Sequence, residues 1–80
     1  NRVVSAGDLD QSVLDYAKQI CGASSYTVTL GKQAFYKQLE MGISDAYQLA
    51  GETMVRNLQN QDAKEGISAF LEKRAPKWTN

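Results

Sequence analysis

Residues 62–76 read DAKEGISAFLEKRAP and carry signals for both ends of a helix. Asp62 followed three residues later by Glu65 matches the capping box, in which two side chains satisfy backbone N–H groups of the first turn. Pro76 disfavours helical geometry at the residue before it, so the helix is expected to end at Ala75. Apolar residues recur at helical spacing between these signals; they are Ala63, Ile67, Phe70 and Leu71.

A helix over about 8–21 is expected near the start of the chain. Ser5 and Asp8 form a second capping box, and Gly22 is a natural helix C-cap. The helical apolar stripe there consists of Leu9, Val13, Tyr16, Ala17 and Ile20.

Two more helices are expected in the middle of the chain. The β-branched run 26–30 also suits a strand, but the residues after it favour a helix over about 26–40, ended by Gly42. Ser44 then caps a helix over about 45–60, whose inner face is Ala46, Tyr47, Ala50, Met54 and Leu58. The short connections predict an all-α fold of four helices in an antiparallel array.

Composition limits the function classes. The chain has 80 residues, a net charge of zero, one cysteine and no histidine. A lone Cys21 excludes an internal disulfide and a zinc site, and it suits a reducing interior. Charge of both signs is spread evenly, which disfavours nucleic acid as a partner, and no apolar run approaches the roughly 20 residues of a membrane span. Because so short a chain has a marginal core, it is expected to gain support from other chains or from further sequence.

The chain is expected to be a piece of a longer protein. It lacks an initiator Met, and residues 1–4 read like the end of a strand.

Most candidates for chemistry have a structural interpretation. Asp8 and Asp10 lie near a helix start, where negative side chains interact favourably with the positive end of the helix dipole, so they are interpreted this way rather than as an acid–base pair. Cys21 has no histidine to activate it and is expected to be a small apolar residue. Four aromatic residues are expected to pack rather than to stack on a ligand: Tyr16, Phe35, Tyr36 and Tyr47. Three glycines inside helical patterns predict close helix contacts: Gly31, Gly51 and Gly66.

Phe70, Lys73 and Arg74 are three and four residues apart, so they are expected to share one face of the last helix. In one interpretation Phe70 is core and the two cations offset the negative end of the helix dipole. In the other, this face contacts a ligand.

Residues 62–76 closely resemble the C-terminal signature of the enoyl-CoA hydratase/isomerase (crotonase) family. That signature is an acid, two variable residues, Glu-Gly, an apolar residue, a variable residue and Ala-Phe, then Glu-Lys-Arg and often Pro. Residues 1–4 resemble the end of the family's Gly-Leu-Val-Asn-x-Val-Val strand. The segment 31–40, GKQAFYKQLE, is most similar to the branch of enoyl-CoA hydratase domain-containing proteins.

The resemblance implies that residues 1–80 are the helical C-terminal region that follows a spiral of ββα units and builds trimers or hexamers. It implies a CoA thioester as the substrate of the parent protein, no prosthetic group, no metal, and a cytoplasmic or mitochondrial-matrix location. The oxyanion hole and the catalytic carboxylates would lie upstream, so no catalytic residue is expected here. Phe70 and Lys73 are the two positions implied to contact CoA bound by a neighbouring subunit.

Three functions follow as expectations. The first is an oligomerisation and CoA-contact segment of a crotonase-like enzyme, a hydratase or an isomerase, that is not catalytic alone. The second is a non-enzymatic module in which the helices only self-associate. The third is a free-standing acyl-CoA-binding bundle.

Overall fold

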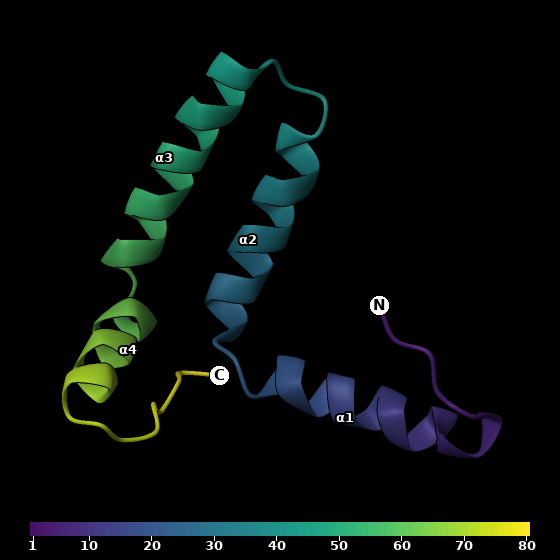
Figure 1. Ribbon diagram of the computed structural model, residues 1–80. Helices are drawn as coiled ribbons and strands as arrows, with labels where there is room; N and C mark the ends of the chain where they lie inside the picture. Colours follow the sequence, from purple (N-terminus) through teal and green to yellow (C-terminus); the bar gives the residue numbers. More distant parts are fainter.

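A computed structural model describes all residues, 1–80, and contains four α-helices and one short 3₁₀ turn (Figure 1). The elements in chain order are η1 (Ala6–Asp8), α1 (Leu9–Cys21), α2 (Ser25–Gln38), α3 (Ile43–Gln59) and α4 (Gln61–Leu71). The chain forms no strand, and residues 1–4 lie outside regular secondary structure. The expected all-α class with four helices is therefore confirmed.

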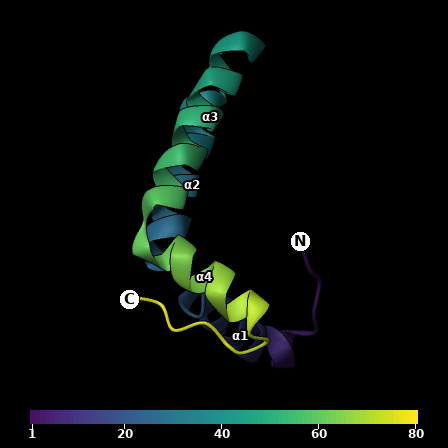
Figure 2. The same cartoon turned by 90° about the vertical axis from the view of Figure 1, so that its left-hand side faces the viewer.

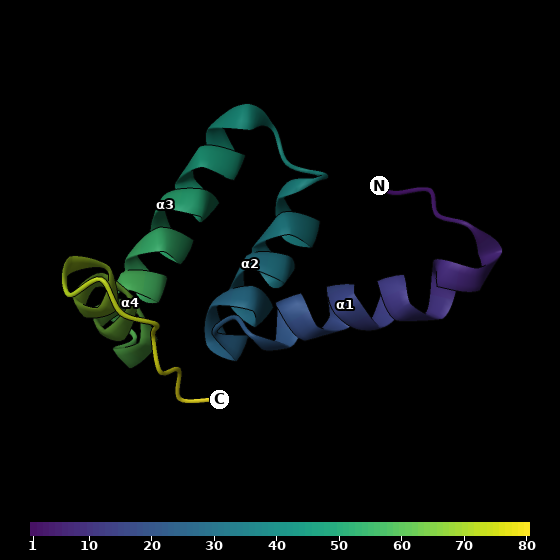
Figure 3. The same cartoon turned by 60° about the horizontal axis from the view of Figure 1, so that its bottom comes forward.

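The helices form an open arrangement rather than a closed bundle. α2 and α3 lie side by side and run in opposite directions, so they make an antiparallel hairpin (Figures 1 and 3). α4 continues from α3 after the single residue Asn60 and changes direction (Figure 2). α1 extends away from the hairpin (Figures 1 and 3). The tail after α4 returns toward the linker between α1 and α2 (Figure 1). The expected antiparallel array is thus limited to α2 and α3.

The first helix begins as expected but is capped differently. The hydroxyl of Ser5 donates to the carboxylate of Asp8 at 2.8 Å, and neither side chain binds a backbone N–H group. The predicted capping box is therefore wrong, because the Asp8 carboxylate takes the hydroxyl and closes the short η1 turn. Gly22 is the C-cap of α1 as predicted, although it keeps a right-handed φ of −76°.

The second helix confirms the helical interpretation of residues 26–30 over the strand. The hydroxyl of Ser24 accepts the N–H of Thr27 at 3.3 Å and acts as the N-cap. The helix ends at Gln38, two residues before the predicted boundary.

The third helix begins at Ile43, with Gly42 as its N-cap, so the prediction that Ser44 is the N-cap is wrong. Gly42 has an extended backbone, and its carbonyl oxygen accepts the N–H of Ala46 at 3.0 Å. Because this backbone bond already starts the helix, Ser44 falls inside the first turn.

The fourth helix is capped two residues earlier than predicted. The side-chain oxygen of Asn60 accepts the N–H of Asp62 at 2.9 Å, so Asn60 is the N-cap and the capping box at Asp62 is wrong. Since Asn60 satisfies the first turn, the carboxylate of Asp62 is left to bind elsewhere.

Little of the chain is buried. Only two apolar residues, Leu30 and Ala69, and two polar residues, Ser24 and Asp62, are shielded from solvent. The accessible surface is 6732 Å², whereas a compact monomer of this length exposes about 4,800 Å². The radius of gyration is 16.2 Å, against about 12 Å for a compact domain. The molecule therefore exposes roughly 1,900 Å² more than a compact monomer would.

The helical stripes do not form one core within this chain. Tyr47, Met54 and Leu58, expected on the inner face of α3, are all exposed, since no second layer lies against them. The four aromatic residues expected to pack are exposed as well. They are Tyr16, Phe35, Tyr36 and Tyr47.

The glycines also differ from expectation. A methyl group at Gly31 or Gly51 would meet no other atom within 4 Å, so neither makes the close helix contact predicted for it. At Gly66 a methyl carbon would lie 3.3 Å from the indole of Trp78. Gly66 therefore makes a close contact, but with the tail rather than with a helix.

None of the helices combines the length and the apolar character needed to cross a membrane.

Candidate functional site

Phe70 lies in the last turn of α4 and its side chain is 82% exposed. Its neighbour Ala69 faces inward and is only 3% exposed. The interpretation that placed Phe70 in a core is therefore wrong for this chain. An aromatic ring so fully presented to solvent is available to pack against another surface.

The helix ends at Leu71 rather than at Ala75, because the chain makes a left-handed turn at Lys73 with a φ of 54°. The N–H of Lys73 donates to the carbonyl of Phe70 at 3.3 Å, and the N–H of Arg74 donates to the carbonyl of Ala69 at 3.0 Å. These two bonds are those of a Schellman motif, which ends a helix well before the proline.

Lysine is an unusual residue for this turn. The left-handed position of a Schellman motif is normally glycine, and a residue with a side chain there costs roughly 1–2 kcal/mol. Lys73 is the one residue other than glycine with a positive φ in the chain. Such strain tends to persist where the surrounding structure over-determines it, often at functional positions.

The turn separates the three residues expected on one helix face. Phe70 is on α4, whereas Lys73 and Arg74 lie beyond its end. All three still lie at the same end of the helix. The Nζ atom of Lys73 makes no hydrogen bond or ion pair within the chain, so its charge is free for a partner.

Arg74 is paired rather than free. Its guanidinium donates to both carboxylate oxygens of Glu65, at 2.6 and 3.2 Å, and its Nε donates to Glu72 at 2.8 Å. The Glu65 carboxylate also accepts the N–H of Lys77 at 2.8 Å. The bonds from Arg74 and then from Lys77 lower the pKa of Glu65 to about 2, and the same pairing raises the pKa of Arg74. Of the two cations, only Lys73 can therefore serve as a free contact.

Asp62 forms a second polar centre that the sequence pattern did not indicate. Its side chain is 1% exposed; it accepts the hydroxyl of Ser24 at 2.6 Å and the N–H of Thr79 at 2.9 Å. The bond from Ser24, followed by that from Thr79, lowers the pKa of the Asp62 carboxyl below its usual value. Asn60, two residues earlier, was the available signal, because an equally good N-cap residue there leaves the aspartate free to bind elsewhere.

The tail completes this arrangement. The indole N–H of Trp78 donates to the carbonyl of Gly22 at 2.9 Å. The side chain of Asn80 bonds to the carbonyl of Ala23 and to the N–H of Ser25, both at 2.7 Å. Residues 74–80 thus tie the end of α4 to the linker between α1 and α2.

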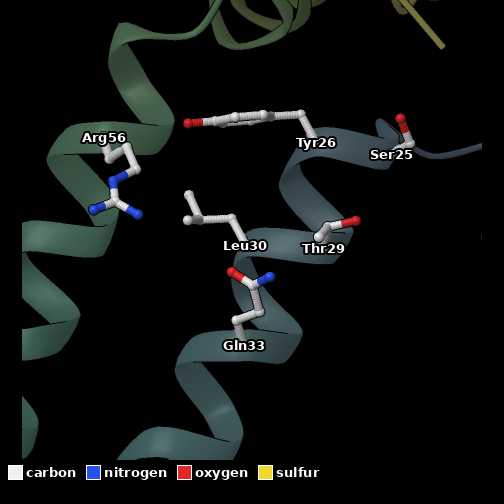
Figure 4. A pocket seen from close by; sticks show the side chains of 6 residues that line it. All are labelled: Ser25, Tyr26, Thr29, Leu30, Gln33 and Arg56. Carbon is white, nitrogen blue, oxygen red and sulfur yellow. The ribbon is translucent and has the colours of Figure 1, made fainter.

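A hollow of about 390 Å³ lies between α2 and α3 (Figure 4). Its lining residues are Ser25, Tyr26, Thr29, Leu30, Gln33 and Arg56. The hydroxyl of Tyr26 is directed toward Arg56, and Leu30 lies between them and Gln33 (Figure 4). These groups suit an anion, but the rim is open and Arg56 is exposed, so the hollow alone specifies no ligand.

The other residues considered for chemistry, Cys21, Asp8 and Asp10, form no catalytic arrangement in the structure. Cys21 is a free cysteine at the end of α1, where it is exposed. Asp8 binds Ser5 and Asp10 lies in the first turn of α1, as the helix-start interpretation requires. No group of three or more His, Cys, Asp or Glu side chains could hold a metal ion.

Comparison with known proteins matches the whole chain. The family model described as "Enoyl-CoA hydratase/isomerase" matches residues 1–80. Enoyl-CoA hydratase domain-containing protein 3, mitochondrial, from Rattus norvegicus is 44% identical over 80 residues, which are 100% of this chain and 27% of that protein. Carnitinyl-CoA dehydratase from Proteus mirabilis is 37% identical over 82 residues, covering 98% of this chain and 31% of that protein.

A solved structure is similar in three dimensions. The enoyl-CoA hydratase from Mycobacterium smegmatis superimposes with a TM-score of 0.94 and 42% identity, over 100% of this chain and 31% of that one. The chain thus spans 27–31% of the length of these proteins.

Proposed function

The chain belongs to the enoyl-CoA hydratase/isomerase family, and from this premise we propose that it is the C-terminal oligomerisation and CoA-contact segment of a family protein that acts on acyl-CoA thioesters. The parent protein is a hydratase or an isomerase. Its catalytic carboxylates and oxyanion hole lie outside residues 1–80, so this segment is not catalytic alone. Carnitinyl-CoA dehydratase among the relatives supports a lyase that uses a CoA thioester.

The pair formed by Phe70 and Lys73 carries the CoA-contact proposal. The ring of Phe70 is 82% exposed, and the ammonium of Lys73 is unpaired. A ring can cover an apolar or adenine surface, and an ammonium binds phosphate. Both residues are exposed, and the resemblance to the family supports a ligand that is bound mainly by an adjacent subunit. CoA is the substrate part they contact, and no prosthetic group takes part.

The excess surface supports the oligomerisation proposal. The accessible area of 6732 Å² exceeds that of a compact monomer by roughly 1,900 Å², and a standard protein interface covers about 800 Å² per partner. The helices therefore have enough exposed surface for more than one interface, as in a trimer or a hexamer. The mitochondrial name of the rat relative supports the mitochondrial matrix, or the cytoplasm in a bacterium, as the location.

Substitution of Lys73 tests the contact in a full-length protein that carries residues 1–80. Lys73→Ala is expected to weaken CoA binding by roughly threefold to a hundredfold, measured by calorimetry. If the contact is to the 3′-phosphate, the variant also loses preference for CoA over dephospho-CoA. Lys18→Ala, which removes an exposed cation in the last turn of α1, is the control for the loss of one positive charge.

The alternative is a non-enzymatic module whose helices only self-associate. The exposed apolar residues favour it as much as they favour the first proposal. If Lys73→Ala binds both forms of CoA as tightly as the parent protein does, the contact is absent and the alternative stands.

A further inference from the structure

Hydrogen bonds hold the turn at Lys73 on both sides, and Glu65 is the centre of the bonds on the tail side. On the helix side, the N–H groups of Lys73 and Arg74 donate to carbonyls of the last turn of α4. On the tail side, Glu65 binds the guanidinium of Arg74 at 2.6 and 3.2 Å and the N–H of Lys77 at 2.8 Å. One carboxylate therefore joins the residues on the C-terminal side of the turn to the middle of α4.

The network matters because the turn is conformationally unfavourable. A φ of 54° disfavours any residue with a side chain, so Lys73 would leave this region if its neighbours were free. Glu65 is mostly shielded, with 24% of its side chain exposed, and its bonds to Arg74 are bidentate and charge-assisted. The tail cannot move away while these bonds hold.

A second contact supports the same restraint. The indole of Trp78 packs on Gly66, the residue next to Glu65, and donates to the carbonyl of Gly22. The tail is thus fixed on both sides of Lys77. A lysine side chain has four rotatable bonds, so its ammonium reaches a reproducible place only if its backbone is fixed.

We propose that Glu65 is a positioning residue for the ammonium of Lys73, acting through Arg74 and the N–H of Lys77. The inference rests on the proposed CoA contact of Lys73 and extends it to a residue that touches no ligand. Glu65 holds the strained turn, and the turn sets where the lysine leaves the backbone.

A double-mutant cycle in a full-length protein that carries residues 1–80 tests the proposal, with CoA as the probe and calorimetry as the readout. Glu65→Gln is expected to weaken CoA binding by about threefold to tenfold. In the Lys73→Ala background the same substitution is expected to change CoA binding by less than about twofold, because the ammonium that Glu65 positions is absent. Equal weakening in both backgrounds, or none in either, overturns the positioning role.

Two further variants keep the result interpretable. Glu72→Ala removes the acceptor of the single bond from Arg74 Nε but spares the tail, so it is expected to leave CoA binding unchanged. Glu65→Asp retains the charge and is expected to bind CoA more tightly than Glu65→Gln does. If Glu65→Gln fails to fold, Glu65→Asp replaces it in the cycle; its weakening of CoA binding is expected to be smaller and again to disappear in the Lys73→Ala background.

Hydrogen exchange separates failure of this proposal from failure of the CoA contact. Glu65→Gln is expected to raise exchange of the four amides within residues 73–77, where Pro76 has none, by at least threefold, while exchange in α2 stays unchanged. If Lys73→Ala leaves CoA binding intact, the proposed function falls, and the proposal that Glu65 serves a CoA contact falls with it. Unchanged exchange at 73–77 in Glu65→Gln overturns the proposal alone, because Glu65 would then not hold the turn.

Discussion

The α2–α3 hairpin and the α4 tail region are held together in different ways. The hairpin buries one large apolar residue, Leu30, and leaves most of the apolar residues of α3 exposed. The tail region consists of α4 and residues 72–80. Hydrogen bonds join it to the α1–α2 linker, and Asp62 and Glu65 accept most of those within it. The first region has apolar surface without partners, whereas in the second every buried polar side-chain atom has a hydrogen-bond partner.

The difference separates two tasks within 80 residues. Directional hydrogen bonds define a geometry, so the tail region can fix the place of Phe70 and Lys73 within this chain. Apolar surface is not directional and gains stability only when it is covered. The hairpin is therefore the region expected to depend on further protein for its stability, and the tail region is the one that carries the proposed CoA contact.

The largest expected effect comes from removing the centre of the tail region. Asp62→Ala leaves the buried hydroxyl of Ser24 and the N–H of Thr79 without their acceptor. Such loss is expected to shift the unfolding equilibrium toward the unfolded state by roughly tenfold to a hundredfold, measured by urea denaturation of a full-length protein that carries the segment.

Asp62→Asn is the matched control. An amide oxygen can still accept the N–H of Thr79, and the amide N–H₂ can donate to the hydroxyl of Ser24, so most of the stability is expected to remain. If both variants lose the same stability, the charge rather than the hydrogen-bond geometry holds the region.

Acid is expected to open the tail region next. The pKa of Glu65 is about 2 in the folded chain against an ordinary value of 4.5, and that of Asp62 is also lowered. A carboxyl with a lowered folded pKa stabilises the fold above its ordinary pKa and loses this contribution as the pH falls through the folded value. The stabilisation is therefore complete above about pH 4.5 and lost progressively toward pH 2.

Amide protection factors report this opening. The N–H groups of Lys77 and Thr79 donate to the two carboxylates and are expected to lose protection within that window. Amides in the middle of α2, such as that of Ala34, are expected to keep theirs. Loss of protection in both regions at one pH would show that the chain unfolds as a single unit.

The hairpin is expected to respond to a change at its apolar face. A groove on this face is lined by Gly31, Ala34, Ala50 and Met54, and Met54 is exposed within it. Met54→Lys places a charge where another chain is expected to pack, so it should weaken self-association by roughly tenfold, measured by sedimentation equilibrium.

Gln33→Lys is the control on the other side of the hairpin, where Gln33 lines the hollow with Arg56. It adds the same charge and is expected to leave self-association unchanged. A protein that stays monomeric at high concentration without any substitution would remove the oligomerisation proposal.

The sequence predicts the elements better than the contacts. Helical periodicity is a property of neighbouring residues, so four helices could be located within about two residues at most ends. The end of α4 was missed by four residues because the Schellman turn places a lysine where glycine is the usual signal. The contacts of Asp62 with Ser24 and Thr79 join residues 38 and 17 positions apart, and no local pattern encodes them.

The two site residues illustrate the same limit. Resemblance pointed to Phe70 and Lys73, but spacing alone placed both on one helix face and left Phe70 available for a core. Only the fold shows that the ring is exposed and that Lys73 lies beyond the helix. Glu65 was interpreted as half of a capping box, since its true partners lie in a tail without regular structure.

The smallest expected effect isolates the backbone of Lys73 from its side chain. Lys73→Gly removes the penalty of about 1–2 kcal/mol for a left-handed residue, offset by about 0.5–1 kcal/mol of extra chain entropy in the unfolded state. The net gain of about 0.5–1 kcal/mol should raise the melting temperature of a full-length protein that carries the segment by roughly 1–4 °C. Lys73→Ala loses the same charge but keeps the Cβ atom, so it should gain nothing. If the glycine variant melts higher than the alanine variant while both lose CoA affinity, the chain keeps its lysine at a cost in stability. If the two melt together, the turn is unstrained, and the strain at Lys73 no longer supports a functional role.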